Sequence, residues 1–342
     1  MTKPDEIRTA FHAMGSKISV VVDAPPSGDS GGSAAVRAML GEVRGWFLGW
    51  ERCLSRFRPD SELSQLNRQA GQPVQVSTTL WEVLQAALEA ARQTGGMVTP
   101  TILPAVEAAG YDRSFEQIAN ATGQHVGEED IHLMGEVDHR IIGCRSGENA
   151  WREIEMDTST RSVRLPIGLR LDLGGFAKGW AADQAAQRIA QVAPVVVDAG
   201  GDIAVSGPRT TGQPWQIGVG HPNDPAQHLA VLPIIQGGVA TSGRNYHHWV
   251  KNGAFQHHLI DPRTGRPAET DVWAATVIAP SALEAEIAAK AVVIAGSEAG
   301  VKWLAAFPRL SAIIVLSERC FLSPITIIDT RSRAQTDTAR PE

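Results

Sequence analysis

Residues 171–183 read LDLGGFAKGWAAD, and the rest of the chain is organised around this motif. An alternating apolar run at residues 163–171 leads into it and predicts a strand. Apolar residues at helical spacing follow, over residues 176–189. The motif therefore predicts a strand, a tight turn at Gly174-Gly175 and a helix, since paired glycines let the backbone turn sharply or approach a ligand closely.

The sequence of the motif alone is consistent with two roles for its turn. Free N–H groups at a helix start favour phosphate, so the loop could contact a nucleotide. It is not a P-loop, because Lys178 precedes Gly179 and the required glycine-lysine spacing is absent. The plain alternative is a Gly-Gly turn that packs a helix on a sheet.

Composition narrows the class of protein. The 342 residues, 43% of them hydrophobic, can bury the core of one large or two modest domains. A net charge of −6 without any basic block argues against a nucleic-acid partner. Cys53, Cys144 and Cys320 form no CxxC pair, which suits a reducing compartment. With no signal peptide, no lipoprotein signal and no apolar stretch of membrane-spanning length, we expect a cytoplasmic protein.

Strands outnumber helices along the chain and cluster together, which predicts an α+β fold. Ser61 and Ser64 could cap a helical turn, and Thr79 to Glu82 have the spacing of a capping box. Residues 117–149 are polar and are interpreted as an insertion with short strands, and residues 329–342 as a disordered tail. The predicted β elements cover residues 11–23, a strand pair at 151–171, two runs around the Gly200-Gly201 turn at 194–205, and residues 215–220, 229–235, 239–243, 272–279 and 311–316. The predicted helices cover residues 36–54, 79–91, 176–189, 282–295 and 301–307.

A hairpin is the clearest local prediction. Asn252-Gly253 favours a type I′ turn that sets Lys251 opposite Ala254. In this register Trp249, His247, His258 and Ile260 share one face, and Val250, Phe255, His248 and His257 share the other.

Four histidines and Asp261 within fifteen residues raise the question of zinc. The register divides the histidines between the two faces, and no HExxH or CxxC motif supports a site, so zinc is not expected. The plain reading of each histidine is a surface or half-buried hairpin residue. His258 is singled out because its face leads to Ile260 and to the turn at Asp261.

Glycine-rich turns recur at strand ends, at Gly174-Gly175, at Gly200-Gly201 and at Gly243. Each is ordinary turn chemistry when taken alone. Together they predict strand ends that converge on a ligand, although none is a dinucleotide-binding fingerprint.

Several ordered motifs carry a resemblance to a known family. They are Met14-Gly15-Ser16, LSRF…DSEL…LN at residues 54–67, DLGGFAKG at 172–179, DAGGD at 198–202, ATSG at 240–243 and HHLIDPRTG at 257–265. Over roughly residues 8–328 the chain resembles the ApbE family of FAD:protein FMN transferases. The resemblance implies a single domain with a T-fold-like arrangement of mixed sheets and packed helices, and a ligand cleft at the strand ends.

The resemblance also implies site residues. FAD contacts are expected from Met14, Phe57, Asp172, Lys178 and Ile260, with Met97, Val98 and Thr99 lining the flavin cleft. Thr99 stands where the family commonly has Asp.

The family's metal, usually Mg²⁺, is implied at the backbone carbonyl of Gly175 and in a late helix. The chain departs from the family pattern in that helix. Glu286 replaces an Asp, Ala289 offers no ligand, and Lys290 occupies the position of a ligating Thr. A cation repels Mg²⁺ at such closeness. The alternative is a helix salt bridge between Glu286 and Lys290, which are spaced i, i+4.

The activity implied is attack by a Ser or Thr hydroxyl of a target protein on the FMN phosphorus of FAD, with release of AMP. Lys178 and the motif's N–H groups could neutralise charge, and His258 is the candidate general base. Two alternatives stay open: an FAD-binding protein without transfer activity, and an FAD pyrophosphatase that gives FMN and AMP.

Overall fold

The computed structural model describes residues 5–24, 32–122, 149–222, 224–316 and 326–329. The chain divides into two compact units. Unit 1 takes in the described residues of 1–48, 178–243 and 270–342, and unit 2 those of 49–177 and 244–269. Most of the predicted insertion at 117–149 and nearly all of the predicted tail lie outside the described residues. Within the described part, residues 117–122 belong to a helix and not to the short strands that were predicted.

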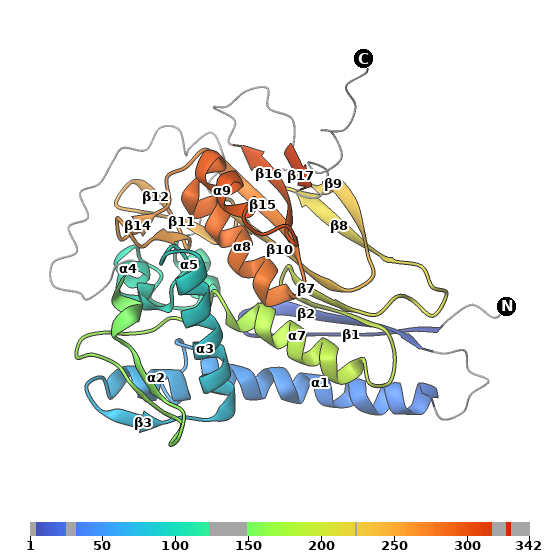
Figure 1. Cartoon of the computed structure of the whole chain (residues 1–342), viewed down its shortest axis with the longest axis horizontal. Helices are drawn as coiled ribbons and strands as arrows, with labels where there is room; N and C mark the ends of the chain where they lie inside the picture. The colour runs from blue at the N-terminus through green and yellow to red at the C-terminus, as the bar shows by residue number, and fades with distance from the viewer. Residues whose placement is uncertain (1–4, 25–31, 123–148, 223, 317–325, 330–342) are drawn as a thin grey trace, which may run out of the picture. The chain divides into compact units, whose positions relative to one another are not determined.

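Unit 1 is built on an eight-stranded antiparallel sheet with strand order β1-β2-β6-β7-β10-β15-β16-β17 (Figure 1). Val20, Val22, Val195 and Val197 are fully buried, as expected for β-branched residues in a covered sheet. The strands are β1 (Asp5–Ala13), β2 (Ser16–Ala24), β6 (Val195–Ala199), β7 (Asp202–Ser206), β10 (Gly237–Gly243), β15 (Val272–Ala279), β16 (Ser311–Leu316) and β17 (Thr326–Asp329).

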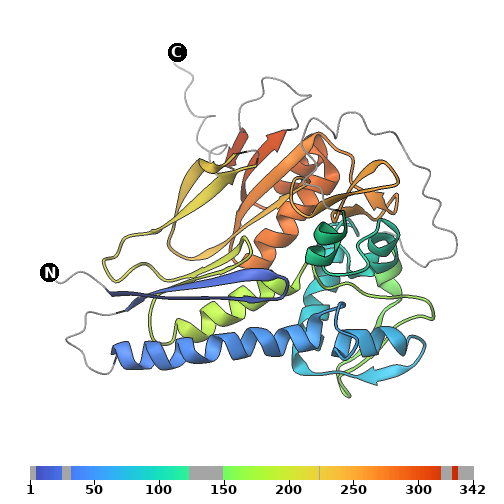
Figure 2. The ribbon, with the colours of Figure 1, turned by 180° about the vertical axis from the view of Figure 1, so that it is seen from behind.

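Helix α8 (Ala282–Ala295) packs against β10 and β15 and is followed by α9 (Ser297–Leu304). Small and branched apolar residues let α8 bury most of its surface. Helix α7 (Ala177–Ile189) runs beside α1 (Gly32–Leu54), as Figures 1 and 2 both show. The Arg188 guanidinium lies 5.0 Å from the ring centre of Trp46, which ties these two helices together.

A ribbon of β8 (Trp215–His221) and β9 (Asp224–Ile234) completes unit 1. Its residues Trp215, Ile217 and Ile234 form a buried cluster with Val196, Val205 and Val239 of the large sheet.

Unit 2 holds shorter elements. Its helices are α2 (Glu62–Arg68), α3 (Thr78–Gln93), η1 (Pro100–Ile102), α4 (Leu103–Ala108), α5 (Phe115–Thr122) and η2 (Ala150–Glu153). Its strands are β3 (Pro73–Gln75), β4 (Glu155–Asp157), β5 (Ser162–Arg164), β11 (His248–Lys251), β12 (Ala254–His257), β13 (Ile260–Asp261) and β14 (Arg266–Pro267). None of the helices in the described ranges is both long and apolar enough to cross a membrane.

The α+β architecture predicted from the sequence is confirmed. The hairpin is also confirmed in its register, since Lys251 pairs with Ala254 and Trp249 with Gln256. Asn252 and Gly253 have φ values of 53° and 76°, the left-handed conformations that a type I′ turn requires.

The strand pair predicted at residues 151–171 is present as β4 and β5, which pair antiparallel. The prediction that the second strand runs on to Leu171 is wrong. Strand β5 ends at Arg164, because Pro166 and Gly168, at φ 82°, interrupt the extended backbone. The backbone N–H and carbonyl of Leu171 bond instead to the side-chain amide of Asn67, at 2.7 and 2.9 Å. Leu165, Leu169 and Leu171 are buried although they form no strand, whereas Ile167 of the same alternating run is 81% exposed. The apolar alternation therefore predicts neither strand pairing nor burial along the whole run.

Two smaller predictions near the N-terminus need correction. The strand predicted at residues 11–23 is two strands, β1 and β2, joined by a turn in which Met14 and Gly15 have φ values of 54° and 69°. Helix α3 is capped by the Ser77 hydroxyl, which accepts from Leu80 N at 3.2 Å, and not at Thr79. The Ser61 cap of α2 is confirmed, with Ser64 N donating at 3.0 Å.

Candidate functional site

Unit 1 gathers three of the predicted site residues around one carboxylate. Glu286 Oε1 accepts from Lys290 Nζ at 2.8 Å and from Lys178 Nζ at 3.3 Å, and Oε2 accepts from Gly179 N at 3.0 Å. Lys178 Nζ also forms an ion pair with Asp202. We call Lys178, Asp202, Glu286 and Lys290 the lysine–carboxylate cluster.

The packing of α7 against α8 builds this cluster. A Cβ added at Gly179 would lie 2.8 Å from both Glu286 Oε2 and Leu283 Cα, so only glycine allows this approach. One turn further along α7, Asp183 accepts from the N–H groups of Ala282 and Leu283 at 2.8 and 2.9 Å. These are free donors at the start of α8, so Asp183 anchors that helix end.

The charges of the cluster depend on one another. Glu286 is fully buried. Burial alone raises its pKa, but the ammonium groups of Lys178 and Lys290 outweigh burial and hold the pKa below its ordinary value. Burial lowers the pKa of Lys178, and the carboxylates of Asp202 and Glu286 reverse this and raise it. Burial and the charge of Glu286 raise the pKa of Asp202 to about 6, against the opposing effect of Lys178.

The ligand atoms available around Glu286 do not suit Mg²⁺. This ion needs about six oxygen ligands near 2.1 Å. Both Glu286 oxygens already accept hydrogen bonds, Ala289 carries no donor atom, and Lys290 is itself a cation. The structure contains instead the i, i+4 salt bridge that the sequence offered as the alternative. Among the residues that the structure describes, no group of three or more His, Cys, Asp and Glu side chains could hold a metal.

Strand ends of unit 1 meet at one end of the large sheet. The β1–β2 turn, which carries Met14, adjoins the β6–β7 turn at Gly200, where an added Cβ would lie 2.6 Å from Ser16. Asp202 opens β7 and pairs with Ala240 of β10, whose remaining residues to Gly243 extend to the same end. Two of the predicted glycine turns therefore converge within this unit, beside the Asp202 partner of Lys178.

In unit 2 the motif residue Asp172 forms a buried ion pair. Arg56 Nε lies 3.2 Å from Asp172 Oδ2, and the two side chains are 6% and 12% exposed. Asp172 Oδ1 accepts from Gly174 N at 2.7 Å, which fixes the turn of the motif just before Gly175. Arg56 Nη2 donates to the carbonyl of Tyr111 at 2.7 Å. Arg56 lies in the LSRF motif but was not among the predicted site residues.

An aromatic group surrounds this pair. Arg56 lies over the rings of Phe57 and Tyr111, at 4.0 and 4.7 Å from their centres. The Phe57 ring is 5.5 Å from Tyr111, and Tyr111 is 6.4 Å from His247. His247 lies 5.3 Å from His258, so a chain of ring contacts joins two predicted site residues, Phe57 and His258. Phe57 is 41% exposed, unusual for a large apolar side chain, whereas His258 is half-buried.

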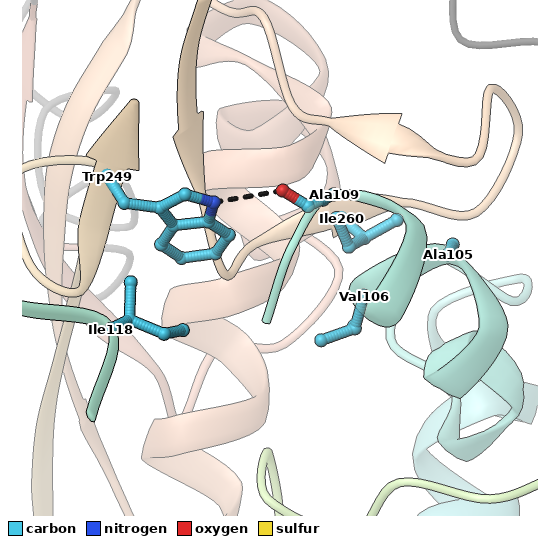
Figure 3. Packing of buried hydrophobic residues seen from close by; sticks show 6 residues of the cluster. All are labelled: Ala105, Val106, Ala109, Ile118, Trp249 and Ile260. Atoms are coloured by element: carbon cyan, nitrogen blue, oxygen red, sulfur yellow. Dashed lines mark hydrogen bonds between the residues drawn. The ribbon is translucent and has the colours of Figure 1, made fainter. Parts of the chain in front are cut away.

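Ile260 lies in the core beneath the hairpin. Its side chain is 1% exposed and packs with Val106 and Trp249, as Figure 3 shows. The Trp249 indole N–H donates to the carbonyl of Ala109 at 2.9 Å. This packing holds the hairpin that carries His258 against α4.

Met97, Val98 and Thr99 follow α3 in unit 2. Val98 and Thr99 are buried and Met97 is half-buried. The Thr99 hydroxyl caps η1, accepting from Thr101 N at 3.4 Å and lying 2.9 Å from the Thr101 hydroxyl. Internal contacts therefore occupy the hydroxyl that stands at the family's Asp position.

Comparison with known proteins identifies relatives along most of the chain. The model of the ApbE family matches residues 14–314. A protein of Treponema pallidum named FAD:protein FMN transferase is 30% identical over 312 residues, covering 87% of this chain and 82% of its own. A protein of Haemophilus influenzae with the same name is 28% identical over 242 residues, covering 68% and 65%.

Solved structures share the fold. The crystal structure of the ApbE protein from Thermotoga maritima matches with a TM-score of 0.76 at 24% identity, covering 96% of this chain and 98% of that one. The flavinyl transferase ApbE of Pseudomonas stutzeri, in its apo form, matches with a TM-score of 0.74 at 20% identity, covering 97% and 98%.

Proposed function

The chain belongs to the ApbE family, and from that premise we propose that it is an FAD:protein FMN transferase. The observation that carries the proposal is the family match across residues 14–314, which includes both the DLGGFAKG motif and the histidine hairpin. FAD is the proposed substrate, and a protein with an accessible Ser or Thr is the proposed partner. We assign the activity to a domain of residues 8–328.

In the proposed reaction, a Ser or Thr hydroxyl oxygen of the target attacks the phosphorus of the FMN half of FAD. A P–O bond forms to the target, the bond from that phosphorus to the bridging oxygen breaks, and AMP leaves with the bridging oxygen. The hydroxyl proton passes to a base. Such chemistry depends mainly on positioning and on neutralising negative charge.

The aromatic group of unit 2 supports the roles proposed there. The exposed ring of Phe57 offers a face on which an isoalloxazine ring can stack. Arg56 packs on the Phe57 ring and pairs with Asp172, so it links the exposed ring to the turn of the motif. His258, half-buried and in ring contact with His247, is the proposed base. Met97, Val98, Thr99 and Ile260 remain proposed neighbours of the flavin.

The lysine–carboxylate cluster supports the role proposed for Lys178. The Lys178 side chain is 22% exposed and its ammonium is held by Asp202 and Glu286, so we propose that it donates to a phosphate of FAD from this fixed position. Met14 is proposed to contact FAD from the β1–β2 turn. The residues at Glu286 do not fit Mg²⁺, so no step of this proposal passes through a metal, although Gly175 remains the implied carbonyl ligand.

The experiment incubates the protein with FAD and a candidate acceptor. We expect flavin fluorescence on the acceptor band of a denaturing gel and one AMP released per acceptor labelled. A Ser/Thr→Ala acceptor is the matched control and should give neither signal. The cytoplasmic location stays a prediction.

The two alternatives give different results in the same experiment. AMP release that is independent of the acceptor indicates an FAD pyrophosphatase. Retained FAD without AMP release and without labelling indicates a binding protein. Either result overturns the proposed function.

A further inference from the structure

We propose that the Lys290 ammonium takes the place of a bound cation at Glu286, so that the cluster is complete without Mg²⁺. The inference deepens the proposed function, because it predicts that FMN transfer by this chain requires no divalent metal. Lys290 is a positioning residue here, since it acts on the motif through the carboxylate of Glu286.

Both oxygens of Glu286 are engaged by hydrogen-bond donors of the protein. Oε1 accepts from both lysines and Oε2 accepts from Gly179 N, and the side chain is fully buried. A metal bonded to Oε1 would have to displace at least one ammonium group from a carboxylate that is closed to bulk solvent.

The charges of the lysine–carboxylate cluster balance without a metal. Lys178 and Lys290 carry two positive charges, and Asp202 and Glu286 carry two negative charges when ionised, so the cluster is neutral as it stands. A metal bonded to Oε1 at about 2.1 Å would lie within about 5 Å of the Lys290 nitrogen, since that nitrogen is 2.8 Å from the same oxygen. At that separation the two cations repel strongly in a buried site.

Lys290 holds Glu286 in place, and through it the start of α7. Its side chain is 13% exposed, so its ammonium is confined near Glu286. Glu286 in turn fixes Gly179 N and Lys178 at the start of α7, directly after the DLGG turn. A cation at Glu286 therefore orients the motif, and Lys290 supplies it from the same helix.

The test titrates the full chain with Mn²⁺ and follows free Mn²⁺ by electron paramagnetic resonance, with thermal unfolding in Mg²⁺ as a second readout. We expect no stoichiometric Mn²⁺ uptake and no rise in Tm. The double variant Glu286→Asp, Lys290→Thr restores a carboxylate and hydroxyl pair and should gain both responses. Lys290→Arg keeps the charge and should gain neither. Lys302→Met, at an exposed position of α9, is the matched control.

Uptake of one Mn²⁺ per wild-type chain, with a Tm that rises in Mg²⁺, overturns the proposal even if the double variant does not fold. Metal binding is measured without any substrate, so its outcome is separate from that of the proposed function. If the wild type binds no metal and also transfers no FMN, only the function fails. If it transfers FMN and EDTA abolishes the transfer until Mg²⁺ is restored, the metal inference fails.

Discussion

The Lys290 ammonium lies 2.8 Å from Oε1 of Glu286, one turn earlier in α8, and that carboxylate is fully buried. An exposed helix pair at this spacing contributes only a few tenths of a kcal/mol. This pair should contribute more than an exposed pair, because a buried carboxylate is shielded from solvent and needs its cationic partners to stay ionised. The pair is therefore part of the structure that positions the motif.

Replacing Lys290 with Met should lower the free energy of unfolding by about 2 kcal/mol, the scale of a hydrogen bond to a charged group. Lys178 remains as a second partner, which keeps the loss below that of a fully isolated charge. Urea unfolding measures the effect, and Lys302→Met should stay within about 0.5 kcal/mol of wild type. Equal effects of the two substitutions would contradict the role given to Lys290.

Gly179→Ala should destabilise the protein by about 1–3 kcal/mol, because the new Cβ meets backbone of α8 at 2.8 Å. Gly41→Ala in α1 is the matched control, since no atom lies within 4 Å of its Cβ position. The control should stabilise by about 0.5–1 kcal/mol, as alanine does in a helix interior. The two substitutions should thus have opposite signs in urea unfolding. A shared sign would show that α7 and α8 do not approach as described.

His257 should make the protein sensitive to acid. Burial, and secondarily the charge of Arg244, lowers its pKa from 6.5 to about 3. Its Nδ1 accepts from Leu259 N at 3.2 Å and its Nε2 lies 3.1 Å from the Ala268 carbonyl, which fixes the neutral tautomer with hydrogen on Nε2. The folded state thus binds fewer protons than the unfolded state, so this stability is present above pH 6.5 and is lost as pH falls toward 3.

Between pH 7 and pH 5, protonation of His257 in the unfolded state should lower the free energy of unfolding by about 2 kcal/mol, at roughly 1.4 kcal/mol per pH unit below 6.5. Unfolding at a series of pH values measures it. His257→Gln should reduce the dependence of the free energy of unfolding on pH between pH 7 and pH 5, whatever its effect on stability at pH 7. His12→Gln, on the exposed face of β1, should leave that dependence unchanged. An unchanged pH slope in His257→Gln would rule out this source of acid sensitivity.

Phe57→Ala should weaken FAD binding about tenfold or more, because stacking on one aromatic side chain contributes about 1–3 kcal/mol. The variant should still fold, since the ring is 41% exposed, although it loses the contacts of the ring with Arg56 and Tyr111. Calorimetric titration with FAD measures the Kd. Ile167→Ala removes a side chain of unit 2 that is 81% exposed and should leave the Kd unchanged. An unaltered Kd in Phe57→Ala would remove Phe57 from the flavin site.

Local sequence patterns predicted the elements whose geometry is local. Asn252-Gly253 specified the hairpin and its register because the turn type leaves few choices. The strand before the motif could not be predicted in this way. The apolar residues do alternate there, but Pro166 ends the strand. The backbone N–H and carbonyl of Leu171 bond to the side chain of Asn67, about a hundred residues away, instead of to a neighbouring strand.

In the candidate site as well, contacts within one helix could be predicted from the sequence, and contacts between distant segments could not. Spacing alone could pair Glu286 with Lys290 on one helix, and the structure contains that pair. Nothing local to Lys178 indicated that it shares the same carboxylate, because α7 and α8 are far apart in sequence. Arg56 was overlooked for a similar reason: its partners Asp172 and Tyr111 come from other segments, and only the fold shows that its charge is buried.

The most direct test of the account is the intact mass of an acceptor protein after incubation with this chain and FAD. We predict an added mass equal to FMN less one water, located on a Ser or Thr by fragmentation, and unchanged by EDTA. An acceptor of unaltered mass, under conditions in which an established FAD:protein FMN transferase labels it, would contradict the proposed function.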